Sequence, residues 1–205
     1  MKKLLFVTTV LFLSCAFSPQ KKTKIIFFGD SITELGVKEK PYRGYILELE
    51  DKSKAENKSD QYDFIGSGIS ANKVYDLYLR LEDDVLSKNP DVVFIYVGVN
   101  DVWHKTLLGT GTDADKFEKF YLAILKKLKD KNIKAVLVTP AVVGEKTDMS
   151  NPLDGDLNKY CNTSGILLRR MICLLLIYEK NLVTTTKQIT QTTKKKIFLL
   201  MIKCT

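Results

Sequence analysis

The sequence contains very little histidine and cysteine. Of its 205 residues only His104 is a histidine, and no cysteine occurs between residues 16 and 160. A disulfide framework is therefore excluded over that stretch, which must be stabilised by a hydrophobic core. The longest apolar run, residues 4–17, is shorter than the roughly 20 residues that a membrane-spanning helix needs. With 45% hydrophobic and 27% charged residues, the composition indicates a globular chain of one domain.

The basic charge is confined to the last part of the chain. The formal net charge is +8, but residues 1–160 carry 24 Lys and Arg against 23 Asp and Glu, whereas residues 161–205 carry 8 against 1. A nearly neutral body lacks the basic surface that nucleic acids require, and we expect no nucleic-acid partner. A basic C-terminal stretch is the kind of segment that binds an anionic surface.

The first 22 residues resemble an export signal followed by a polar tether. Lys2 and Lys3 precede the apolar run, and Cys15 stands near its end, as in bacterial lipoprotein signals. This pattern predicts a lipid-modified Cys15, membrane attachment through it, and a location in the bacterial cell envelope or periplasm. The alternative is cleavage near Ser18, which would remove Cys15 and yield a secreted protein.

Apolar runs and helical patterns alternate through residues 23–160, which we interpret as one domain. Short apolar runs predict strands, and apolar positions three and four residues apart predict helices between them. Such alternation is typical of a parallel sheet with helices on both faces, an α/β fold whose ligands bind at the carboxyl ends of the strands. The predicted strands are 24–29, 62–66, 91–97 and 134–139, and the predicted helices are 41–51, 72–87 and 113–131.

Three short polar segments follow predicted strands and should therefore meet at one edge of the sheet. They are Gly-Asp-Ser-Ile-Thr at 29–33, Gly-Ser-Gly-Ile-Ser at 66–70 and Gly-Val-Asn-Asp at 98–101. A serine hydroxyl beside converging N–H donors is the arrangement that acyl transfer through a tetrahedral oxyanion requires. Taken singly, the same residues could be helix caps and a turn glycine.

The order and spacing of these segments resemble the SGNH (GDSL-type) esterase and lipase hydrolases, over roughly residues 24–160. The resemblance implies a flavodoxin-like three-layer α/β/α fold and hydrolysis of an ester, with no metal or other cofactor. By position, Ser31 would be the nucleophile, and the Ser31 N–H, the Gly68 N–H and the Asn100 amide would form the oxyanion hole. Asp30 and Asp101 would support these residues.

The sequence departs from the family in two places. The family often has a second glycine where this chain has Ala71. It also supplies its general base from an Asp-x-x-His segment near the C-terminus, and this sequence contains no such segment. His104, three residues after Asp101, is the single candidate for a substitute base. The alternative is a histidine at the substrate mouth or on the surface.

The composition of residues 161–205 offers an explanation for the missing base. The stretch has no Asp, no Pro, one Gly and 8 Thr, which is typical of a reading frame not selected as protein. The sequence can be translated back into codons and read in a shifted frame, in which the third base of each codon is joined to the first two bases of the next. In that frame each Met-Ile pair yields an Asp codon. Residues 201–205 can then encode Asp-Lys-Val-His. We therefore predict a one- or two-nucleotide slip near residues 160–161, leaving a truncated domain with one uncovered flank on its fourth strand.

The sequence predicts an exported carboxylic-ester hydrolase that is impaired because the catalytic Asp and His are absent. Its substrate would be a small ester, either an acetylated sugar or a lipid ester. Three alternatives stay open. The chain could be a binding pseudoenzyme, a non-functional gene remnant, or a basic membrane-associating module that depends on residues 161–205.

Overall fold

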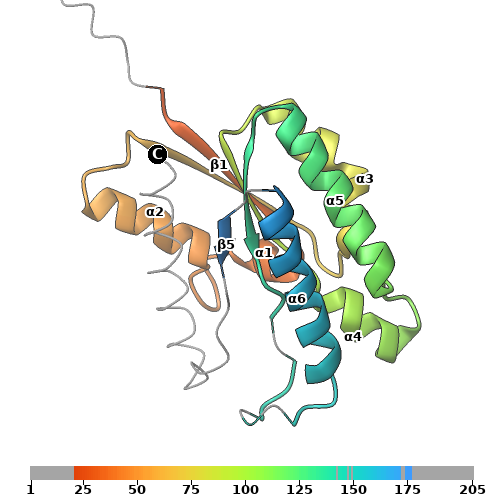
Figure 1. Cartoon of the computed structure of the whole chain (residues 1–205). Helices are drawn as coiled ribbons and strands as arrows, with labels where there is room; N and C mark the ends of the chain where they lie inside the picture. The colour runs from red at the N-terminus through yellow and green to blue at the C-terminus, as the bar shows by residue number, and fades with distance from the viewer. Residues whose placement is uncertain (1–20, 142, 147, 149, 172–173, 177–205) are drawn as a thin grey trace, which may run out of the picture.

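The computed structural model describes residues 21–141, 143–146, 148, 150–171 and 174–176. They form a five-stranded parallel sheet with the order β2-β1-β3-β4-β5 (Figure 1). This flavodoxin-like order confirms the predicted fold class. The strands are β1 Thr23–Gly29, β2 Tyr62–Gly68, β3 Val92–Tyr96, β4 Lys134–Val138 and β5 Leu174–Leu176.

Helices cover both faces of the sheet, as predicted. On one face α3, α5 and α6 share a hydrophobic core, and α2 packs on the other (Figure 1). Since successive residues of a strand point to opposite faces, Ile26 and Phe28 of β1 enter the first core and Ile25 and Phe27 the second. The helices are α1 Ser31–Leu35, α2 Tyr45–Ala55, α3 Val74–Asp84, α4 Val99–Leu108, α5 Ala114–Asp130 and α6 Asp154–Met171, with a 3-10 turn at Leu86–Lys88.

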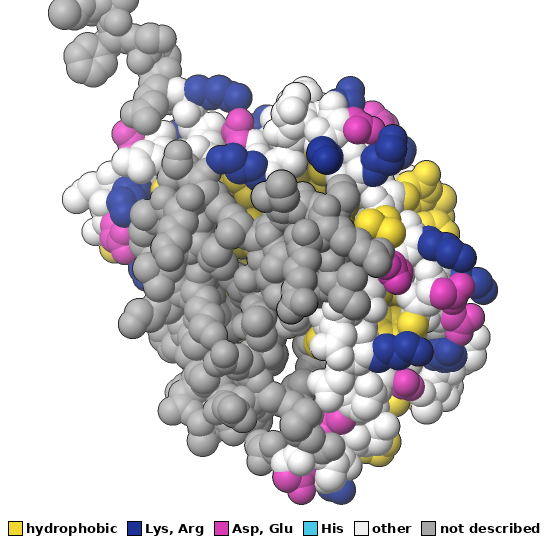
Figure 2. Space-filling model, in the orientation of Figure 1, with side chains coloured by type: hydrophobic (Ala, Val, Ile, Leu, Met, Phe, Trp, Pro, Cys, Tyr) yellow, Lys and Arg dark blue, Asp and Glu magenta, His cyan; other side chains and the backbone are white. Residues whose placement is uncertain are grey.

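Charges on the outside of the domain are mixed in sign. Figure 2 shows basic and acidic side chains interspersed over α5. Ion pairs join Lys119 to Asp115 at 3.6 Å and Lys126 to Asp130 at 3.2 Å. This surface agrees with the nearly neutral charge count of residues 1–160.

The second helix begins later than the sequence pattern predicts. We expected it to start at Pro41, but α2 begins at Tyr45. Gly44 lies directly before it in an extended conformation, and a Cβ on Gly44 would overlap the backbone of Gly36. This close approach fixes the path of the chain up to Gly44, so the helix can begin only afterwards.

The structure corrects the expectation of an uncovered strand. Helix α6 continues through residues 160–161 to Met171, and β5 then pairs in parallel with β4, with Val136–Val138 opposite Leu174–Leu176. The predicted free flank of the fourth strand was therefore wrong along these residues. Cys15 and residues 177–205, with the predicted lipid site and the back-translated Asp-x-x-His, lie outside the described residues. Within the described part, no helix is long and apolar enough to cross a membrane.

Candidate active site

Ser31 lies on a tight turn between β1 and α1 that is closed by the preceding aspartate. Asp30 is fully buried at the N-cap of α1, and its Oδ1 accepts a hydrogen bond from the Ile32 N–H at 3.0 Å. Burial raises the pKa of the Asp30 carboxyl to about 6, although the bonds from backbone N–H groups oppose the shift. Asp30 thus braces the turn, and Ser31 is left half-buried at the carboxyl end of β1.

Gly68 lies where this turn touches the end of β2. Gly68 pairs with Gly29 in the sheet, and a Cβ at Gly68 would overlap the backbone nitrogen of Glu34 and lie 2.7 Å from the carbonyl oxygen of Asp30. Only glycine permits that approach. Packing against α1 therefore accounts for Gly68, and its predicted role as an oxyanion donor stays a prediction.

The loop after Gly68 folds over α1 through a second contact. The Glu34 carboxylate accepts hydrogen bonds from the Ser70 backbone N–H at 2.7 Å and from the Ser70 hydroxyl at 2.6 Å. These bonds lower the pKa of Glu34, the hydroxyl bond having the larger effect. The next residue, Ala71, has a φ of 65°, in the left-handed region that favours glycine. Its position, where the family often has glycine, was the one sequence feature that could have identified this loop conformation.

Asn100 and Asp101, at the start of α4, join the third segment to the same loop. The Asn100 Nδ2 donates to the carbonyl oxygen of Asn72 at 3.0 Å, which leaves one further N–H on the amide. The Asp101 carboxylate accepts from the Val74 N–H at 3.1 and 3.3 Å and so holds the start of α3. Burial raises the pKa of Asp101 to about 6, while the bond from the Val74 N–H opposes the shift.

The three predicted segments therefore meet at one edge of the sheet. Asn100 contacts the loop at Asn72, the loop contacts α1 through Ser70, and the Ile69 N–H donates to the Gly29 carbonyl at 3.2 Å. The convergence expected from the sequence is correct. The arrangement brings the turn that carries Ser31, the loop 68–72 and Asn100 to the same edge of the sheet. An oxyanion hole requires such a convergence of N–H donors beside a nucleophile.

His104 lies on α4 but does not have the surroundings of a general base. It is 8% exposed, and burial together with the nearby charge of Lys73 lowers its pKa. Within the described part of the chain no carboxylate is hydrogen-bonded to it, whereas a catalytic histidine is oriented by such a group. Among the same residues, no group of three or more His, Cys, Asp or Glu could hold a metal ion.

Ala71→Gly is expected to raise the free energy of unfolding. An alanine in the left-handed region costs about 1–2 kcal/mol, and the extra entropy of an unfolded glycine offsets part of that, so the net gain should be about 0.5–1 kcal/mol. Urea unfolding measures it. The control Ala123→Gly, within α5, should lower stability by about 0.5–1 kcal/mol. A loss of stability at both positions would contradict the left-handed conformation of Ala71.

Asp101→Asn is expected to change how stability depends on pH. Because the folded pKa of Asp101 exceeds its unfolded value, the carboxyl stabilises the fold below about pH 4, and this contribution is lost as pH rises through about 6. The native chain should therefore lose roughly 2–3 kcal/mol relative to the variant between pH 4 and 7. In the control Asp51→Asn the sign should reverse, because the bond from Arg43 lowers the pKa of Asp51. Parallel pH curves for the native chain and Asp101→Asn would refute this expectation.

Comparisons with known proteins agree with this geometry. An acetylxylan esterase from Geobacillus stearothermophilus is 32% identical over 114 residues, which are 51% of this chain and 52% of the relative. The chain thus spans about half the length of that curated relative. The crystal structure of an acetyl xylan esterase, AlAXEase, is 53% identical and has a TM-score of 0.74, over 85% of this chain and 83% of that one.

A more distant solved structure is a variant of Axe2, an acetyl xylan esterase from Geobacillus stearothermophilus. It is 25% identical, with a TM-score of 0.67 over 75% of both chains. Structures described as catalytic mutants of Axe2 alter a serine, an aspartate and a histidine three residues after the aspartate. Residues 27–165 of this chain match the GDSL-like lipase/acylhydrolase family, and the chain belongs to that family.

Proposed function

We propose that this chain derives from an esterase that removes acetyl groups from a xylan-type polysaccharide or its oligosaccharides. The observation that carries the proposal is the meeting of Ser31, the loop 68–72 and Asn100 at one sheet edge. Two relatives described as acetylxylan esterases, one of them 53% identical, support an acetylated sugar over a lipid ester.

In the proposed reaction the Ser31 hydroxyl attacks the carbonyl carbon of the acetyl ester. The serine proton passes to a base as the new C–O bond forms, and the carbonyl oxygen becomes an oxyanion. The Ser31 N–H, the Gly68 N–H and the remaining Asn100 N–H would donate to that oxygen. The sugar hydroxyl then leaves with the proton, and water hydrolyses the acetyl-serine.

We propose that this chain lacks an efficient base for this proton transfer. His104 has no carboxylate bonded to it among the described residues, and the sequence holds no other histidine. When members of a catalytic triad are removed, the oxyanion hole and substrate binding still leave roughly 10³–10⁴-fold catalysis over water. A slow, Ser31-dependent turnover is therefore the activity to expect.

A reading-frame slip remains our explanation for the missing base. The family match ends at residue 165, and Met171-Ile172 already yields an Asp codon in the shifted frame, so the slip fits best between these points. That is slightly later than residues 160–161. The Asp-Lys-Val-His permitted by residues 201–205 has the same aspartate-to-histidine spacing as the catalytic mutants of Axe2.

We also propose that the chain is exported and held at the membrane by a lipid on Cys15. The basic start and apolar run before Cys15 support this. An attached acyl group would be detected as a mass increase on the N-terminal peptide.

Ser31→Ala is expected to abolish the slow hydrolysis of p-nitrophenyl acetate by this chain. The variant keeps the fold, since Ser31 is half-buried on the first turn of α1, but it loses the attacking oxygen. The matched control is Ser87→Ala, an exposed serine that bonds to the Asp83 carbonyl. Equal turnover by the native chain and Ser31→Ala would show that any hydrolysis is non-specific and would favour the binding pseudoenzyme.

Restoring the alternative frame after residue 165 is expected to raise turnover by roughly 10²–10⁴-fold, the contribution of a positioned general base. Sequencing the gene comes first, because it shows whether that frame encodes Asp-x-x-His. The control is the same repaired chain with the new histidine changed to Ala. An open frame without Asp-x-x-His in either alternative phase would refute the slip.

A further inference from the structure

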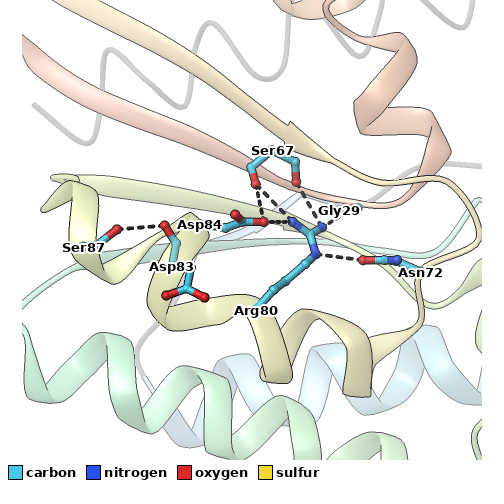
Figure 3. A network of polar contacts seen from close by, with 7 residues as sticks. All are labelled: Gly29, Ser67, Asn72, Arg80, Asp83, Asp84 and Ser87. Atoms are coloured by element: carbon cyan, nitrogen blue, oxygen red, sulfur yellow. Dashed lines mark hydrogen bonds and ion pairs between the residues drawn. The ribbon is translucent and has the colours of Figure 1, made fainter.

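The guanidinium of Arg80, on α3, lies against the carboxyl ends of β1 and β2 (Figure 3). Its Nη2 donates to the carbonyl oxygen of Gly29 at 2.8 Å and to that of Ser67 at 3.2 Å. Gly29 directly precedes the turn of Asp30 and Ser31, and Ser67 directly precedes Gly68. The Arg80 guanidinium therefore bonds to the ends of both strands that precede the first two motifs.

The same side chain also reaches the third motif through Asn72. The Arg80 Nε donates to the Asn72 side-chain oxygen at 2.7 Å (Figure 3). The backbone oxygen of Asn72 in turn accepts the bond from the Asn100 Nδ2 at 3.0 Å. The position of the Asn100 amide thus depends on a loop residue whose side chain is held by Arg80.

Arg80 is held in one orientation by the remaining contacts. Its Nη1 donates to the Ser67 hydroxyl at 3.1 Å and to the Asp84 carboxylate one turn along α3, and its guanidinium stacks at 4.4 Å from the centre of the Phe28 ring. All five N–H groups of the guanidinium therefore have acceptors. The side chain is 14% exposed, so its charge is largely buried but paired with Asp84.

We propose that Arg80 is a positioning residue that fixes the spacing between Ser31, the loop 68–72 and Asn100. The catalytic meaning of this role rests on the proposed esterase function. Anchoring of α3 does not require the arginine, because Leu77 and Leu81 already bury that helix in the core. A lysine cannot replace it, since an ammonium lacks the planar fork that bonds two carbonyls and a side-chain oxygen at once.

Backbone hydrogen exchange on the full chain tests this placement without requiring activity. In Arg80→Lys, the exchange rate of residues 29–36 and 66–73 should increase by about tenfold or more, while the exchange rate of α5 stays unchanged. Only the strand ends lose hydrogen bonds to the arginine. Asn72→Ala should increase the exchange rate of residues 66–73 alone. The control Arg43→Lys removes a different arginine that makes two hydrogen bonds, both to the Asp51 carboxylate. It should leave the exchange rates of residues 29–36, residues 66–73 and α5 unchanged.

Ser31-dependent turnover of p-nitrophenyl acetate provides the second readout. Arg80→Lys should lower kcat by about tenfold or more with KM unchanged, because misplaced donors affect the transition state more than substrate binding. Unchanged exchange at the strand ends, equal acceleration that includes α5, or an unchanged kcat would each overturn the proposal. If the native chain shows no Ser31-dependent turnover, the proposed function fails for this chain, and the exchange measurement alone decides the role of Arg80.

Discussion

The close approach of two parallel strand ends, Gly29 of β1 and Gly68 of β2, is the constraint on which the site depends. A side chain at Gly68 would push the turn of Asp30 away from the sheet. That turn determines where Ser31 lies, and the path of the loop after Gly68 determines which N–H groups are near the turn. Arg80 bonds to the backbone on both sides of this contact, and its buried charge is compensated by Asp84. The site is thus organised by backbone geometry more than by its polar side chains.

Much of this organisation could be predicted because buried parallel strands carry a simple pattern. Continuous apolar runs indicated four strands to within two residues, and polar segments directly after three of them indicated the edge where the site lies. The helices were harder to predict. The first turn of helix α4, which begins at Val99, contains Asn100 and Asp101, two polar residues that tertiary contacts bury, so no apolar stripe indicates its start. The start of α2 depends on the contact of Gly44 with Gly36, which no local pattern contains.

The roles of individual residues were less predictable than their location. Gly68 is expected to donate to an oxyanion, and the structure adds a second reason for glycine at this position, because a Cβ would overlap the backbone of α1. Ala71 stands where the family often has glycine, and its left-handed backbone shows why glycine suits that position. Arg80 was not singled out, because a lone arginine within an amphipathic helix is usually a solvated residue. Only the fold brings its guanidinium to the ends of both β1 and β2, and through Asn72 to the segment that contains Asn100.

In the proposed reaction the oxyanion donors and the general base would come from different parts of the sequence, and that separation would allow the donors to persist without the base. The buried carboxylates of Asp30 and Asp101 each bind a backbone N–H and hold the start of a helix; no bond joins either to His104 among the described residues. The contacts that link the three motifs lie well before residue 165: Arg80 bonds to Gly29 and Asn72, and Asn100 bonds to Asn72. A base supplied from beyond residue 165 would complete the reaction without setting this geometry. A change confined to that later segment would remove proton transfer while leaving the preorganised donors in place.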